Sequence, residues 1–211
     1  MRSFRNSDHG YVNKEEIQVS FASLEDYVSA IENYIEQGDL IAEKEFYSAV
    51  RFRGQKSNRS FLDKGITYLE FRNFDLNPFE RIGISQTTMD TVHLLILAFL
   101  WLDSPENVDQ ALTQGHALNE KIALSHPLEP LPAEAEAETK DIVKALDQLV
   151  QHFGLGDYHQ DLVKKVKAAF ADPSQTLSAQ LLPYIKDESL ADFALNKALA
   201  YQDYDWTAPY A

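Results

Sequence analysis

One stretch, residues 65–79, limits most strongly what this chain can fold into. Its central residues alternate between apolar and polar types, which is the pattern of a strand with two different faces. Successive side chains of a strand point to opposite sides, so Leu69 and Phe71 share one face, while Tyr68, Glu70 and Arg72 share the other. We therefore expect a strand here, with one face suited to a core and the other to a cleft.

The polar face of this strand has two interpretations. A carboxylate and a guanidinium two residues apart, as in Glu70 and Arg72, can hold a metal ion beside a phosphate. Mg²⁺ prefers oxygen ligands, and arginine forms forked hydrogen bonds to phosphoryl oxygens. The same spacing is also common in solvated ion pairs that contribute little to stability. Spacing alone leaves both interpretations open.

Composition excludes several classes of protein. With 211 residues, of which 45% are hydrophobic, the chain can bury the core of one large domain or two small ones. Its 33 acidic and 19 basic residues give a net charge of -14, which repels nucleic acids and anionic membrane surfaces. No cysteine is present, so disulfides, thiolate metal sites and cysteine nucleophiles are excluded.

The apolar segments argue against a membrane partner. The longest run, residues 92–102, is well short of the roughly 20 residues that cross a bilayer. It predicts a buried helix. The first residues contain no apolar stretch of the kind found in secretory signals. We expect a cytoplasmic protein with neither a membrane nor a nucleic acid as its partner.

The N-terminal part is predicted to contain loops, one helix and a pair of strands. Residues 1–13 read as a loop, and a capping box that begins at Ser23 predicts a helix over 24–37. Partial alternation in 39–53 predicts an extended segment that carries Tyr47, Arg51 and Arg53. A polar loop then leads to the strand in 65–79, so the two strands most simply pair antiparallel. The register is not predictable.

Beyond Pro78 the pattern is helical. The connector 125–132 holds three prolines and cannot be helix, so it is the best internal boundary. Helices are predicted over about 86–102, from 104, over 133–153, from 157 to Pro173, over 174–186 with a bend at Pro183, and over 188–201.

These elements predict an α+β fold with a few antiparallel strands within about 40–75 and a helical C-terminal two-thirds. We expect one domain over 1–211, in which 1–85 holds the site and 86–211 is helical.

Few residues remain as candidates for chemistry. The six histidines lack metal-site spacing, and no glycine-rich phosphate loop follows a strand. Tyrosines beside charges are often half-buried packing residues, and Arg51 could serve only as a cross-strand salt-bridge partner. The candidates are Arg5, Tyr11, Tyr47, Arg51, Glu70 and Arg72.

Four ordered motifs resemble those of bacterial glutamate-cysteine ligases. The segment 68–79, YLEFRNFDLNPF, followed by IGIS at 82–85, is similar to the signature of that family. Residues 5–13, RNSDHGYVN, resemble its Arg-x-Ser-Asp-x-Gly-Tyr-x-Asn segment, and residues 45–51, EFYSAVR, resemble its Glu-Leu-Tyr-x-x-Ile-Arg strand. Matches at 170–173 and 177–179 extend the resemblance over most of the chain.

The resemblance implies a glutamine-synthetase-like carboxylate-amine ligase fold and a reaction that consumes ATP. In this family the glutamate side-chain carboxylate is phosphorylated, and the cysteine amine then displaces phosphate, with Mg²⁺ as the metal. By resemblance, Glu70 is a Mg²⁺ ligand and Arg72 contacts the transferring phosphoryl group of ATP. The resemblance also implies that Tyr11 and Tyr47 line the cysteine pocket. Arg5 and Arg51 would contact a substrate carboxylate or phosphate. By the same resemblance, Arg5 would bind an amino-acid substrate, and Arg51 would bind ATP.

The chain also departs from the family. The catalytic region of these ligases is much longer, and its first half resembles nothing here, so we expect the C-terminal part of a ligase domain that is inactive alone. The tail resembles the run towards an ATP-grasp domain, as in bifunctional proteins of glutathione biosynthesis.

Two other interpretations stay open. One is a helical interaction module without catalysis, which would self-associate or bind a partner through an exposed sheet edge. The other is a related carboxylate-amine ligase with a different acceptor.

Overall fold

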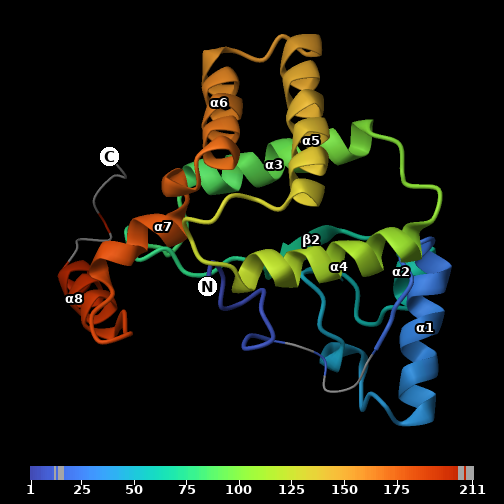
Figure 1. Ribbon diagram of the computed structural model, residues 1–211. Coiled ribbons are helices and arrows are strands. Elements are labelled where there is room, and N and C mark those ends of the chain that lie inside the picture. The colour runs from blue at the N-terminus through green and yellow to red at the C-terminus, as the bar shows by residue number, and fades with distance from the viewer. Residues whose placement is uncertain (12, 14–16, 204–206, 208–211) are drawn as a thin grey trace. The chain divides into compact units, whose positions relative to one another are not determined.

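The computed structural model describes residues 1–11, 13, 17–203 and 207 (Figure 1). The chain divides into two compact units. The strand unit comprises 3–75 and 104–124, and the helical unit comprises 1–2, 76–103 and 125–211. The expectation that all 211 residues form one domain stays a prediction.

The strand unit combines a two-stranded antiparallel sheet with helices. Strand β1 (Val50–Arg53) pairs with β2 (Tyr68–Phe71), and the register places Arg51 opposite Glu70. The predicted pairing is confirmed, but the strands are shorter than the stretches expected to form them. Tyr47 precedes β1, and Arg72 extends the ladder beyond β2 through its N–H, 2.8 Å from the Ala49 carbonyl oxygen. The other elements are α1 (Leu24–Gln37), the 3-10 turn η1 (Glu43–Glu45), α2 (Ser60–Lys64) and α4 (Val108–Leu124).

Helix α1 forms as the capping pattern predicts. The Ser23 hydroxyl oxygen accepts a hydrogen bond from the Asp26 N–H at 3.0 Å, and Gly38 ends the helix at φ 88°, which suits glycine. The buried face of α1, Tyr27, Val28 and Ile31, builds the core of the strand unit with Val19, Leu40 and Phe46.

The apolar face of the sheet meets this core only in part. The Phe52 ring lies 4.8 Å from that of Tyr27, centroid to centroid, and also contacts the rings of Phe21 and Phe61. Leu69, opposite Phe52, keeps 37% of its surface exposed. The face expected to be core is therefore half-buried at Phe52 of β1 and exposed at Leu69 of β2.

Burial of Tyr27 should make the strand unit sensitive to alkali. Desolvation raises the pKa of its phenol above 10.0, and Glu43 raises it further while Arg51 opposes the shift. Below pH 10 the Tyr27 phenol is neutral in both the folded and the unfolded protein, so it does not change the free energy of unfolding. As pH rises from the pKa of the unfolded state towards that of the folded state, the free energy of unfolding falls. In urea unfolding between pH 8 and 11, Tyr27→Phe should show a smaller alkaline loss of stability. An equal loss would contradict this assignment.

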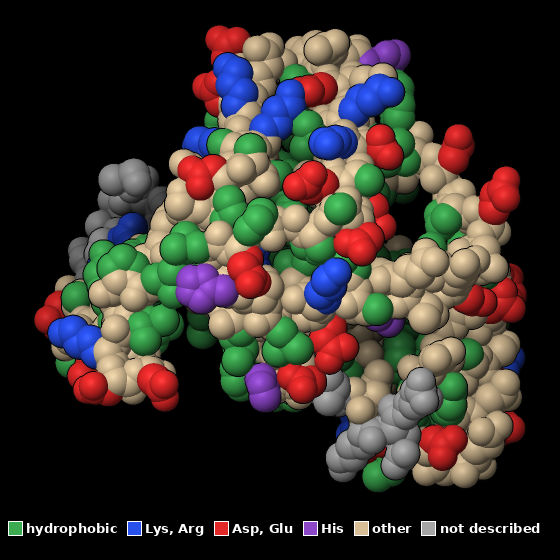
Figure 2. Space-filling view, in the orientation of Figure 1, with side chains coloured by type: hydrophobic (Ala, Val, Ile, Leu, Met, Phe, Trp, Pro, Cys, Tyr) green, Lys and Arg blue, Asp and Glu red, His purple; other side chains and the backbone are tan. Residues whose placement is uncertain are grey.

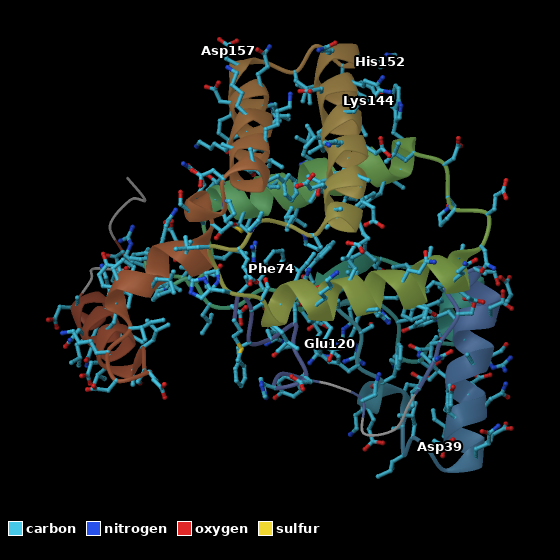
Figure 3. All side chains as sticks on the ribbon, viewed as in Figure 1. Asp39, Phe74, Glu120, Lys144, His152 and Asp157 are labelled. Carbon is cyan, nitrogen blue, oxygen red and sulfur yellow. The ribbon has the colours of Figure 1, made fainter. Side chains whose placement is uncertain are left out.

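The helical unit is organised around α3 (Gln86–Trp101). Helices α5 (Ala133–His152) and α6 (Asp157–Ala171) run antiparallel across it, with His152 and Asp157 at either side of their turn (Figures 1 and 3). The three helices share a core of Leu94, Ala98, Ala145, Leu146, Leu149, Val150, Leu162 and Val163. Outward surfaces of α5 and α6 carry charges of both signs (Figure 2).

The C-terminal part of this unit is more broken than expected. The predicted bent helix 174–186 is three short pieces, η2 (Pro173–Gln175), α7 (Leu177–Leu181) and η3 (Leu182–Tyr184), before α8 (Ala191–Gln202). Pro183 lies in η3, where its lack of an N–H donor shortens the helix.

The prediction that the apolar run 92–102 forms a buried helix is half wrong. It is helical to Trp101, but only Leu94 and Ala98 are buried, while Leu100 is 80% exposed. The reason is that α3 packs against α5 and α6 through Leu94 and Ala98, while Leu100 lies outside the core that the three helices share. Within the described ranges, no helix combines the length and the apolar character needed to cross a bilayer.

Candidate functional site

The site begins with a loop, residues 3–11, which contains hydrogen bonds of its own. The buried Ser7 hydroxyl donates to the Phe4 carbonyl oxygen at 2.8 Å, and the Gly10 N–H donates to the Ser7 carbonyl oxygen at 3.0 Å. A Cβ atom at Gly10 would lie 2.4 Å from the Arg5 carbonyl oxygen, so only glycine allows this close approach. The loop thereby brings Tyr11 next to Arg5.

Four of the predicted residues form one stack. The Arg5 guanidinium lies 5.6 Å from the centroid of the Tyr11 ring, which stacks on the Tyr47 ring at 5.8 Å with an angle of 21°. The Arg72 guanidinium lies 5.1 Å from the Tyr47 centroid. This Arg5–Tyr11–Tyr47–Arg72 arrangement, the cation–aromatic stack, joins three segments distant in sequence. Cations over aromatic faces attract by about 0.5–1 kcal/mol each at exposed sites.

Tyr47 is fixed at three points although it lies outside a strand. Its N–H donates to the Asn13 side-chain oxygen at 2.7 Å, and its carbonyl oxygen accepts from the Asn13 amide at 3.2 Å. Its hydroxyl donates to the Arg72 carbonyl oxygen at 3.4 Å. Asn13 was not among the candidates, although its place two residues after Tyr11 in the matching motif was a signal for it.

A second group of residues lies on the polar face of the sheet. Glu70 faces Arg51 in the register, yet its Oε2 atom is paired with Arg53 Nε at 2.6 Å. Arg53 is opposite Tyr68, so the contact is diagonal across the two strands. Arg53 was predicted on the same segment but not as a site residue. Arg53 lies two residues after Arg51, so the two side chains share one face of the strand. This spacing was the feature of the sequence that could have indicated Arg53 as a site residue.

This face has an excess of positive charge. In the described part of the chain, the side chains of Arg51 and Arg72 make neither an ion pair nor a hydrogen bond. Burial lowers the pKa of the Arg51 guanidinium, with repulsion from Arg53 and Arg72 as lesser causes. The hydrogen bond from Arg53 lowers the pKa of the Glu70 carboxyl, and the charges of the three arginines add to it. A cationic face on a chain of net charge -14 suits an anionic ligand that accepts forked hydrogen bonds.

The residues near Glu70 suit a metal ion that is bound together with a phosphate-containing ligand. Among the described residues, no three acidic or histidine side chains come close enough to hold a cation by themselves. Glu70 offers one carboxylate near Arg51 and Arg72, which form no ion pair within the described part of the chain. Mg²⁺ is commonly held by one or two carboxylates, substrate phosphates and water, so Glu70 fits a metal that arrives with a polyphosphate.

Comparison with known proteins finds a family model that matches part of the chain and relatives that match all of it. The family model described as glutamate-cysteine ligase matches residues 38–122. The glutathione biosynthesis bifunctional protein GshAB of Streptococcus thermophilus is 92% identical over all 211 residues. The protein of the same name from Streptococcus agalactiae is 53% identical over the same length. The chain spans 28% of the length of these curated relatives.

Solved structures share the fold. A bifunctional glutathione synthetase from Pasteurella multocida matches 95% of this chain and 27% of its own, with a TM-score of 0.84 and 39% identity. A glutamate-cysteine ligase from Francisella tularensis in complex with AMP matches 96% of this chain and 48% of its own, with a TM-score of 0.79 and 20% identity. These likenesses agree with the predicted α+β fold.

Proposed function

We propose that this chain belongs to the glutamate-cysteine ligase family and that its cationic face and cation–aromatic stack take part in joining the glutamate side-chain carboxylate to the amine of cysteine at the expense of ATP. The observation that carries the proposal is that, among the described residues, Arg51 and Arg72 have no anionic partner in hydrogen-bonding contact and share one face of the sheet with the carboxylate of Glu70. The 211 residues would form part of the ligase region of a larger protein. The reaction is the first step of glutathione synthesis, which we place in the cytoplasm.

The proposed reaction has two steps. The glutamate side-chain carboxylate attacks the γ-phosphorus of ATP, so ADP leaves and an acyl phosphate forms. The amine of cysteine then attacks the acyl carbon, loses a proton and expels phosphate. Both steps build negative charge on phosphoryl oxygens, and fixed cations lower the barrier by stabilising that charge.

The arginines have different proposed roles in these steps. Arg72 contacts the transferring phosphoryl group and is the catalytic residue, while Arg51 binds ATP phosphates. Glu70 is the Mg²⁺ ligand on this chain, and Mg²⁺ when bound neutralises phosphate charge. The ion pair with Arg53 keeps the Glu70 carboxylate ionised when no metal ion is bound.

The stack supplies the proposed pocket for the acceptor. Tyr11 is 64% exposed, so its ring remains available to a ligand, while Tyr47 is anchored through Asn13. The two rings offer an apolar wall to the cysteine side chain, and Arg5 is available for a substrate carboxylate.

Two alternatives are less well supported. The family match does not favour a non-catalytic interaction module or a ligase with another acceptor. Self-association through the edge of the sheet remains a proposal that sedimentation can test.

The experiment measures ADP release by a protein that carries this chain at the full length of its relatives. Release should require glutamate and cysteine together. Hydroxylamine should intercept the acyl phosphate as a glutamyl hydroxamate when cysteine is omitted. Faster release with another amino acid than with cysteine would favour the other ligase, and no release with any acceptor would refute catalysis.

A further inference from the structure

Asp75 connects the loop that carries half of the stack to the segment that follows β2. Its Oδ1 atom accepts from the Arg5 N–H at 3.0 Å, and its Oδ2 atom accepts from the Ser3 hydroxyl. Asp75 lies three residues beyond Arg72 on a segment without regular secondary structure, on which Figure 3 labels Phe74. Both carboxylate oxygens of Asp75 thus accept hydrogen bonds from the same short segment, residues 3–5.

Further bonds run in parallel with these two. The Arg5 Nε atom donates to the Arg72 carbonyl oxygen, and the Asn6 amide donates to the Asn73 carbonyl oxygen at 2.7 Å. Residues 3–6 therefore lie along residues 72–75 and are joined to them by several hydrogen bonds. Helix α4 supports the same piece, because the Ser3 N–H donates to the Ala123 carbonyl oxygen at 3.2 Å.

The loop depends on these contacts more than a helix or strand would. The described residues 1–11 contain no regular secondary structure, so no ladder of their own fixes where the loop lies. Arg5 and Tyr11 reach Tyr47 only if the loop keeps its register against 72–75. Of the contacts that fix this register, the Asp75 carboxylate supplies two, and a charged acceptor makes stronger hydrogen bonds than a neutral one.

We propose that Asp75 is a positioning residue: it sets the register of the loop 3–11 so that Arg5 and Tyr11 complete the stack on Tyr47. This inference rests on the proposed function where it concerns the acceptor pocket. Asp75 acts through Arg5 and Tyr11 and has no contact of its own with the reacting atoms. A role as a metal ligand makes a different prediction, because it would need the charge of the carboxylate rather than its acceptor geometry.

The first test needs no activity and uses the chain as it is. Amide hydrogen exchange of residues 3–10 should become about tenfold faster or more in Asp75→Ala, since two hydrogen bonds to the loop are lost. Asp75→Asn should fall in between, because the amide oxygen still accepts from the Arg5 N–H. The matched control is Asp63→Ala, which removes the same charge from an exposed position of α2 and should leave exchange of the loop unchanged. Unchanged exchange in Asp75→Ala would overturn the inference.

The second test is a double-mutant cycle in the full-length ligase. Asp75→Ala should raise the KM for cysteine about tenfold while changing kcat less than threefold. In a Tyr11→Ala background, the same substitution should add less than twofold, because residues that act through one another are not additive. Additive effects of the two substitutions would overturn the positioning role, as would an apparent Mg²⁺ affinity that falls equally in Asp75→Asn and Asp75→Ala.

The two tests separate failure of the inference from failure of the proposed function. If Tyr11→Ala leaves the KM for cysteine unchanged, the acceptor pocket is refuted, while faster exchange in Asp75→Ala still supports the placement of the loop by Asp75. If exchange is unchanged, the inference fails whatever the enzyme does.

Discussion

Replacing Arg72 by alanine in a full-length protein that carries this chain should lower kcat about 10²–10³-fold, the usual effect of removing one donor aimed at developing negative charge. The substitution is unusually selective. The backbone carbonyl of Arg72 accepts from Arg5 and Tyr47, and its N–H bonds to Ala49, so these contacts persist without the side chain. The loss is therefore expected in turnover rather than in folding, and rapid-quench measurement of acyl phosphate formation checks it.

Two variants accompany this measurement. Arg72→Lys keeps the charge but loses the forked geometry, so it should recover only part of the lost rate. Arg59→Ala removes an exposed arginine that pairs with Glu32, and it should leave kcat within twofold of the parent. A kcat for Arg72→Ala within threefold of the parent would show that its guanidinium does not contact the phosphoryl group.

The second large effect concerns Glu70. Glu70→Gln should raise the Mg²⁺ concentration needed for half-maximal activity at least tenfold, because even residues that only support a metal ligand contribute about 10–100-fold to affinity. Binding of Mn²⁺ with ATP, followed by electron paramagnetic resonance, should weaken in parallel and gives a readout that does not depend on turnover.

Arg53→Gln is the matched control for this change. Both variants remove the Arg53–Glu70 ion pair, but only Glu70→Gln removes the carboxylate. Arg53→Gln should leave Mg²⁺ affinity unchanged or higher, since the carboxylate no longer has a competing cation. If both variants lose affinity equally, Glu70 serves the structure of the sheet rather than the metal.

Sequence patterns predicted the long helices well because each has its own periodicity and caps. Helix α1 occupies the predicted residues, and α5 ends one residue early. The helix expected from Ser104 begins instead at Val108, because Asn107 caps it: its Oδ1 atom accepts from the Gln110 N–H at 3.0 Å. Helix α2 was not predicted, since five residues are too few to show a helical period.

The site was predictable as a set of residues but not as an arrangement. The alternation of 68–72 gives the face of each side chain, while the register that sets Arg51 opposite Glu70 depends on pairing between distant segments. The diagonal bond from Arg53 follows from that register. The stack was equally invisible in the sequence, because it depends on hydrogen bonds between distant segments, in which the side-chain oxygens of Asp75 and Asn13 accept from the N–H groups of Arg5 and Tyr47.

The close approach at Gly10 has a genetic consequence. Every missense change in this codon adds at least a Cβ atom, and that atom would lie 2.4 Å from the Arg5 carbonyl oxygen and 2.7 Å from that of Phe4. Both obstacles are backbone atoms, so no rotation of a side chain relieves the clash. Codon 10 therefore tolerates only synonymous substitution as long as the loop keeps this path, even though its residue touches no ligand in the proposed reaction.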